Sequence, residues 1–137
     1  MICQFNISWM RRPYFDPSWD IWKNVLVPAL HARAREAPGF LSVWDGTETP
    51  EGYLAPYPSE PLVMGNLSAW ESLSALRVFV HEDPVHRAVM RRSAQWFLPP
   101  QKSPWSVIYE SNTLDLEEAV TFMNWRTLAC AILSTTN

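Results

Sequence analysis

The sequence predicts an α+β fold built on one antiparallel sheet of four strands, and two observations support this. Four short segments alternate between apolar and polar residues, which is typical of strands whose two faces differ. Helical patterns separate them in the order strand, helix, strand, strand, helix pair, strand, with one more helix at the C-terminus. This is the β-α-β-β-α-β order of a ferredoxin-like domain with an added helix. At 137 residues, we expect a single domain over 1–137.

The strands are predicted over residues 3–9, 40–45, 61–72 and 104–111. The faces of the first strand carry Cys3, Phe5, Ile7 and Trp9 on the apolar side and Gln4, Asn6 and Ser8 on the polar side. One face of the third strand carries Met64, Asn66, Ser68 and Trp70. The fourth strand alternates Trp105, Val107 and Tyr109 with Ser106, Ile108 and Glu110. Because the first and third strands are neighbours in this topology, the polar face of the first continues into the Asn66 face of the third.

The first helical segment lies between the first two strands. Asp16 and Pro17 are a suitable start, and Pro38 with Gly39 is a suitable end. Pro28 stands inside this segment, where its missing N–H should kink or divide the helix.

The other helices also begin with capping residues. Ser72 can cap a helix that follows the third strand, and Asp83 with Pro84 begins a second helix directly after it. Asp115 and Glu118 resemble a capping box and start the final helix.

Residues 46–61 form a proline-rich connection that cannot pair regularly as a strand. Connections of this length are often lids or binding loops, and a disordered connection is the alternative. Tyr53 within it could close over a ligand.

The apolar face of the first strand needs a cover, because helices occupy only one face of the sheet in this topology. Phe5, Ile7 and Trp9 would be buried if a second copy packed sheet against sheet. We therefore expect a homodimer through the sheet face, forming a dimeric α/β barrel.

Several classes of function are disfavoured. A net charge of −3 does not suit nucleic-acid binding. The chain has no signal-peptide pattern and no apolar run long enough to cross a membrane, so we expect a cytoplasmic protein without membrane contact. Cys3 and Cys130 are isolated, His81 and His86 lack metal-ligand spacing, and no phosphate loop or nucleophile elbow is present. We expect no metal.

Five pieces of the sequence carry a family resemblance: "QFNI" at 4–7, "PGFLSVW" at 38–44, "LVMGNLSAWESLSALRVFV" at 62–80, "HRAVMRRSAQWF" at 86–97 and "LEEAV" at 116–120. In these pieces the chain resembles domain-of-unknown-function family 3291, within the dimeric α/β-barrel superfamily that includes antibiotic biosynthesis monooxygenases. The tail at 121–137 does not resemble the end of the family.

This resemblance implies a small-molecule pocket between the helices and the covered face of the sheet, one per subunit. The superfamily contains cofactor-independent monooxygenases, haem-degrading oxygenases, isomerases and cyclases, so the fold does not choose the reaction. Haem-degrading members bind iron through a histidine on the helix that corresponds to the one carrying His86, which makes haem a possible cofactor; otherwise we expect none.

Three residues are the main candidates for the site. His86 lies in the first turn of its helix, where a neutral imidazole could move a proton; a solvated or capping histidine is the alternative. Asn6 could donate to an oxyanion or bound dioxygen, or could bridge neighbouring strands. Trp70 could wall the pocket or belong to the core. Further substrate contacts are predicted for Asn66, Ser68, Met90 and Tyr53.

We therefore expect a biosynthetic enzyme that acts on an apolar aromatic or polyketide-like substrate by cofactor-independent monooxygenase-type chemistry. His86 would transfer the proton, and Asn6 would stabilise an enolate. The alternatives are a cyclase or isomerase with the same pocket, a haem-binding protein with His86 as axial ligand, and a non-catalytic dimeric binding module.

Overall fold

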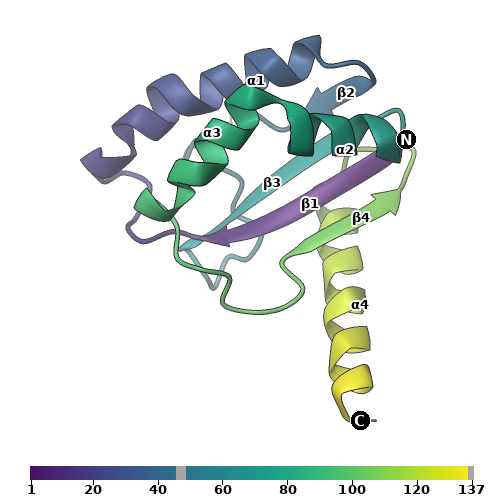
Figure 1. Ribbon diagram of the computed structural model, residues 1–137. Coiled ribbons are helices and arrows are strands. Elements are labelled where there is room, and N and C mark those ends of the chain that lie inside the picture. Colours follow the sequence, from purple (N-terminus) through teal and green to yellow (C-terminus); the bar gives the residue numbers. More distant parts are fainter. Residues whose placement is uncertain (46–48, 136–137) are drawn as a thin grey trace.

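The computed structural model describes residues 1–45 and 49–135 and contains the predicted four-stranded antiparallel sheet (Figure 1). Its strands are β1 (Ile2–Trp9), β2 (Phe40–Val43), β3 (Val63–Trp70) and β4 (Ser106–Glu110). Their order across the sheet is β2-β3-β1-β4, and every pair is antiparallel. The ferredoxin-like topology is therefore confirmed, with β1 beside β3 as predicted.

The helices are α1 (Val27–Glu36), α2 (Leu73–Glu82), α3 (Pro84–Arg92) and α4 (Leu116–Thr135). Helices α1, α2 and α3 lie over one face of the sheet, and α4 lies on the other side and extends away from it (Figure 1). None of the helices in the described part of the chain has the length and apolar character needed to span a membrane.

Pro28 divides the helix as predicted, and the turn before it is wider than an α-helical turn. A π-helical turn, Trp22–Leu26, precedes α1, and the Val27 N–H donates to the Trp22 carbonyl at its end. Pro28 has no N–H, so it cannot form the α-helical hydrogen bond to the carbonyl four residues before it. The π-helical turn lies where this bond is missing. Trp22 and Leu26 remain buried on the side that faces the sheet.

The three predicted caps are present. The Ser72 Oγ accepts the Ala75 N–H at 3.1 Å, and an Asp83 carboxylate oxygen accepts the His86 N–H at 2.9 Å. At the start of α4, the Asp115 carboxylate accepts the Glu118 N–H at 2.9 Å. Local side-chain chemistry therefore sets the beginnings of α2, α3 and α4.

The apolar residues of β1 are covered within one chain, and the homodimer through the sheet face stays a prediction. Phe5 and Ile7 are 0% and 1% exposed without a second copy. Their cover includes Ala119 and Met123 of α4, which are fully buried in the same cluster. A cover in the same chain removes the need for a partner to bury this face.

Part of the proline-rich connection completes this cover. Residues 46–48 lie outside the described residues, but Leu54 is buried and its carbonyl accepts the Gly65 N–H of β3 at 2.7 Å. A Cβ at Gly65 would lie 3.0 Å from the Phe5 ring and 3.1 Å from Leu54. Glycine therefore allows this segment to approach the sheet closely.

Candidate functional site

Two apolar contacts join the helix-side face of the sheet to the helices, one near each end of β3. At one end, Met64 packs into an apolar cluster that includes Trp22 and Val89. At the other end, Trp70 is buried, and its ring centroid lies 5.3 Å from that of Phe79 in α2. These two contacts leave the middle of the face between them.

That middle is polar and accessible. Between the two anchors β3 presents Asn66, which is exposed, and Ser68, which is half-buried. On the neighbouring strand Asn6 is also half-buried. Because these side chains lie on the face toward which α1, α2 and α3 are packed, their exposure means that solvent enters between the helices and the sheet. We take this stretch as the candidate site.

A row of polar side chains crosses three strands here. Asn6 of β1 is in register with Asn66 of β3 on one side and with Ser106 of β4 on the other. Directly opposite residues of antiparallel strands project to the same face. Ser106 was not among the predicted site residues, because its position beside Asn6 depends on a pairing between segments 100 residues apart.

Two hydrogen bonds orient the polar groups of this row as donors. The Ser106 hydroxyl donates to Asn6 Oδ1 at 2.5 Å, and the Trp70 indole N–H donates to the Ser68 Oγ at 3.1 Å. Since Oδ1 and one Ser68 lone pair are occupied, the Asn6 amide N–H groups and the Ser68 O–H are the groups that can serve a ligand. Within the described part of the chain, no hydrogen bond uses the Asn6 amide nitrogen. The row can therefore hold a carbonyl oxygen or an oxyanion.

His86 lies in the first turn of α3, and its ring packs on the Phe79 ring at a centroid distance of 5.2 Å. Burial lowers the pKa of His86, and this outweighs the opposing effects of the Val80 backbone and the Asp83 carboxylate. Its Nδ1 is buried and has no hydrogen-bond partner among the described residues. The neutral imidazole is therefore the favoured form at neutral pH.

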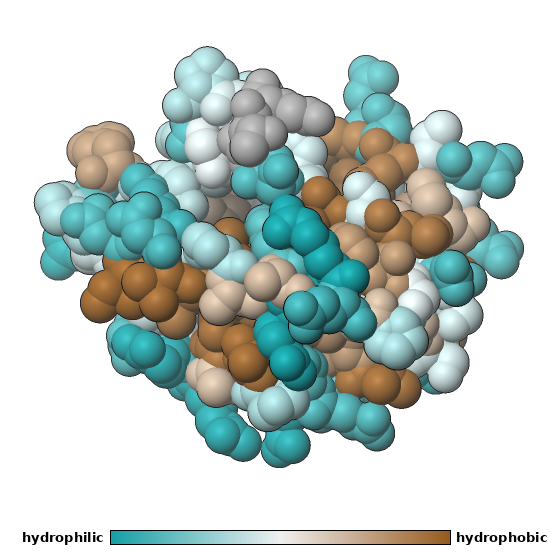
Figure 2. Space-filling model, turned by 90° about the horizontal axis from the view of Figure 1, so that it is seen from above, coloured by the Kyte–Doolittle hydropathy of each residue, from teal (hydrophilic) through white to brown (hydrophobic). Residues whose placement is uncertain are grey.

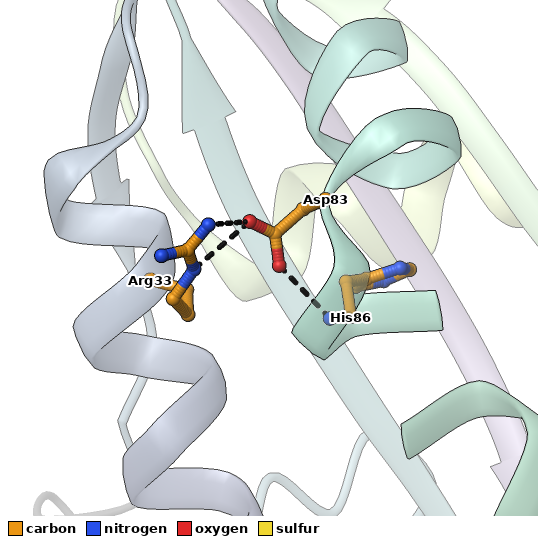
Figure 3. Close-up of polar contacts among 3 residues, drawn as sticks. All are labelled: Arg33, Asp83 and His86. Carbon is orange, nitrogen blue, oxygen red and sulfur yellow. Dashed lines mark hydrogen bonds and ion pairs between the residues drawn. The ribbon is translucent and has the colours of Figure 1, made fainter. Parts of the chain in front are cut away.

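The Asp83 carboxylate accepts a hydrogen bond from the His86 backbone and makes none with the His86 ring among the described contacts. One oxygen accepts the His86 N–H at 2.9 Å, while the other accepts Arg33 of α1 at 2.6 Å (Figure 3). The imidazole turns away from this pair in Figure 3. Burial alone would raise the pKa of Asp83. The hydrogen bond from Arg33 and the hydrogen bond from the His86 backbone outweigh this effect and lower the pKa.

Phe79 separates two of the predicted site residues. Its ring lies between Trp70 and His86, with centroid distances of 5.3 Å and 5.2 Å. Trp70 also meets Phe40 of β2 at 5.4 Å. Both Trp70 and His86 are predicted site residues, and in the structure each of them packs against the Phe79 ring. Trp70 itself has the burial of a core residue, at 2% exposed.

Met90 and Tyr53 occupy different surroundings. Met90 lies one helical turn after His86 on α3 and is 42% exposed, so it can contact a ligand on that side. Tyr53 packs against the Tyr14 ring at 5.0 Å, and its hydroxyl donates to the Pro61 carbonyl. Tyr53 therefore anchors the proline-rich connection to the helix-side apolar cluster, and its role in substrate binding stays a prediction.

The outer surface of the helical layer holds a separate groove of about 710 Å³ between α1 and α2. It is lined by Arg33, Gly39, Ala75, Phe79 and Asp83, among others, and not by the Asn6 row. Seen from this side, apolar side chains reach the surface in patches that hydrophilic residues separate (Figure 2). Phe79 and Asp83 both line this groove and both contact His86, Phe79 through its ring and Asp83 through the His86 backbone N–H.

The residues present do not offer a prepared metal or haem site. Among the described residues, no group of three or more histidine, cysteine, aspartate or glutamate side chains could hold a metal ion. His86 is the residue that the resemblance suggests for haem, but its Nδ1 is buried and its ring is packed on Phe79 beside the Val80 backbone. Neither of the two grooves found among the described residues is lined by His86, so no space for a porphyrin beside it is observed and we derive no step through haem.

The fold and the match over most of the chain define the class to which the protein belongs. It has the ferredoxin-like α+β fold, and residues 1–121 match the family described as a domain of unknown function (DUF3291). The chain therefore belongs to the DUF3291 family. No curated protein shows significant similarity to it.

Solved structures with the same fold share little sequence with the chain. SnoaB of Streptomyces nogalater, a cofactor-independent oxygenase, is 10% identical with a TM-score of 0.55 over 82% of this chain and 93% of its own. A candidate antibiotic biosynthesis monooxygenase of Nitrosomonas europaea is 13% identical with a TM-score of 0.56 over 81% and 89%. A dimeric protein of unknown function from Bacteroides fragilis is 15% identical with a TM-score of 0.55 over 80% and 96%. These likenesses show the fold.

Proposed function

We propose that this protein binds an apolar aromatic small molecule on the helix-side face of its sheet and catalyses cofactor-independent oxygenase-type chemistry on it. One observation supports the proposal: Asn6 and Ser68 lie on the helix-side face of the sheet, each with an oxygen that already accepts a hydrogen bond, between the Met64 contact and the Trp70 contact. Their remaining donor groups suit a substrate with a carbonyl or phenolic oxygen attached to apolar rings. The activity named for SnoaB is in keeping with this chemistry.

The chain's own residues divide the reaction into two tasks. The neutral imidazole of His86 accepts the proton of an acidic C–H or O–H group, which requires its contact with Phe79 to open so that Nδ1 reaches the substrate. The Asn6 amide and the Ser68 hydroxyl then hold the oxygen on which negative charge develops. The electron-rich anion can react with dioxygen directly. Ser106 positions Asn6 by fixing the orientation of its amide.

Dioxygen uptake with anthrone, an electron-rich tricyclic probe, tests the proposal. Asn6→Ala should lower the rate by about a hundredfold or more, the effect of removing one oxyanion donor. Ser8→Ala is the matched control, since Ser8 shares this strand and face but lies outside the Asn6 row. A wild-type rate in His86→Ala would defeat the proton-transfer role. Wild-type turnover that continues without dioxygen would instead identify a cyclase or isomerase.

A non-catalytic binding module is the second candidate. It is favoured by the burial of the His86 Nδ1 and by the Phe79 ring between His86 and Trp70. In this case anthrone would shift the side-chain amide NMR signals of Asn6 and Asn66 without any turnover. Titration with haemin separates the remaining alternative: we expect no Soret shift that depends on His86, and a shift lost in His86→Ala would restore the haem hypothesis.

A further inference from the structure

The ring of Phe79 in α2 has the outer groove on one side and two predicted site residues on the other. It lines the groove between α1 and α2, and its centroid lies 5.3 Å from that of Trp70 and 5.2 Å from that of His86. The imidazole of His86 turns away from Asp83, another residue of the groove, in Figure 3. The half-buried Phe79 ring is therefore a partition between the groove and His86.

This partition encloses a polar atom that the fold leaves without a partner. Nδ1 of His86 is buried and makes no hydrogen bond among the described residues. Such an atom is destabilising, and a ligand that bonds to it removes this cost. An aromatic side chain on a helix can change its rotamer while the helix stays folded. A movement of the Phe79 ring would make Nδ1 accessible from the groove.

The size and lining of the groove suit an aromatic molecule. Its volume of about 710 Å³ is within the range of small-molecule sites. Apolar side chains contribute a large share of the lining, namely Ala37, Pro38, Ala75, Val78 and Phe79. A flat apolar ring system can therefore be held against these side chains before it passes Phe79.

The charges around the groove disfavour anions. The described lining contains four carboxylates and one guanidinium, namely those of Glu36, Glu71, Glu82, Asp83 and Arg33. Arg33 is paired with Asp83 at 2.6 Å, so its charge is already compensated. The excess of negative charge lowers the local concentration of anions and leaves that of uncharged molecules unaffected. An aromatic substrate that still carries its acidic proton is therefore favoured over its anion.

We propose that the groove between α1 and α2 admits an uncharged aromatic substrate to His86, and that the Phe79 ring is the gate that must move aside. This inference rests on the proposed function, because it supplies the route by which the substrate reaches the proton acceptor. Val78, the preceding residue, also lines the groove and is 48% exposed, which makes Val78→Ala the matched control for a change at Phe79.

Labelling with diethyl pyrocarbonate at neutral pH tests the gate, with each histidine followed by mass spectrometry. Phe79→Ala should raise the labelling rate of His86 about tenfold relative to the exposed His81, because it removes both ring contacts that keep the gate closed. Val78→Ala should leave the rate unchanged. Phe79→Leu keeps an apolar side chain, should give a smaller increase, and replaces Phe79→Ala if circular dichroism shows that variant to be unfolded. An unchanged His86 rate, or an equal rise at the half-buried His31, would overturn the gate.

Amide NMR shifts test the entrance with two probes that share one ring system, uncharged naphthylmethanol and the naphthoate anion. The uncharged probe should shift the backbone amide signals of Ala75 and Val78, and the anion should bind about tenfold more weakly. Equal binding of the two probes, or shifts at the Asn6 side chain without any at Ala75 and Val78, would contradict this entrance. Neither measurement requires turnover, so a failure of the proposed oxygenase activity is distinguished from a failure of the gate.

Discussion

The imidazole of His86 is a buried base that spends most of its time without a proton at neutral pH. Its pKa is lowered chiefly by burial, so the native state binds fewer protons than the unfolded state between the native pKa and the unfolded value of about 6.5. The stabilisation that this difference provides is fully present above pH 6.5 or so and is lost as the pH falls through the native pKa.

This linkage predicts a measurable pH dependence of stability. From about pH 7 to pH 5.5, the wild type should lose free energy of unfolding, and His86→Gln should lose less, because glutamine does not titrate. Urea unfolding at the two pH values measures both. His31→Gln is a needed comparison, since burial and the nearby Arg35 also lower the pKa of His31. An equal loss in wild type and His86→Gln would contradict the assignment.

Gly39 is a second residue whose surroundings allow a sharp prediction. Its φ is +80°, and a Cβ there would lie 2.6 Å from the Ala75 Cβ. Gly39→Ala should therefore lower the free energy of unfolding by about 2–4 kcal/mol, from backbone strain and overpacking together. Gly52 has a similar φ of +74° with nothing within 4 Å, so Gly52→Ala should cost only about 1 kcal/mol. Equal costs in urea unfolding would show that the Ala75 contact is not the cause.

Asp83 joins two elements, because it caps α3 and is ion-paired to Arg33 of α1. Asp83→Ala should cost about 1–2 kcal/mol of unfolding free energy, the upper part of the range for a lost cap. Asp83→Asn should cost less, since asparagine is also a good cap. Ser72→Ala removes a cap without an ion pair and should cost about 1 kcal/mol. If Asp83→Asn cost nothing and Asp83→Ala cost no more than Ser72→Ala, the link to α1 would contribute nothing.

The beginnings of these helices could be predicted because caps act within three or four residues of the chain. Asp83, Ser72 and Asp115 each bond to a backbone N–H in their own first turn. The π-helical turn could not be specified, since Pro28 indicated only that the helix must change. The candidate site was predictable in part for the same reason: the alternation placed Asn6 and Asn66 on one face, but the bond from Ser106 depends on long-range pairing.

At the scale of the whole molecule, each face of the sheet is covered by a different part of the chain. The apolar face was predicted correctly from alternation, but its cover was not, because alternation shows that a face must be buried and does not identify what buries it. The cover includes α4, since Ala119 and Met123 belong to the same buried cluster as Phe5 and Ile7, and it includes Leu54 of the proline-rich connection.

This cover predicts a large effect of a single truncation. Met123→Ala should lower the free energy of unfolding by about 2–5 kcal/mol, because it opens a cavity in a fully buried position. Asn124→Ala, at the next and exposed position, should change it by no more than about 0.5 kcal/mol. Guanidinium unfolding followed by circular dichroism measures both. Similar small values would mean that α4 is not firmly attached to the sheet.

The position of α4 in the sequence also determines when the apolar face of the sheet is buried during synthesis. β1 is translated before α4, so Phe5 and Ile7 join a buried cluster with Met123 only after residues 10–115 have been translated. Until then the apolar face is open, and exposed surface of this kind is what chaperones bind and what aggregates in their absence. The burial of β1 therefore depends in part on a helix that is translated after all four strands of the sheet.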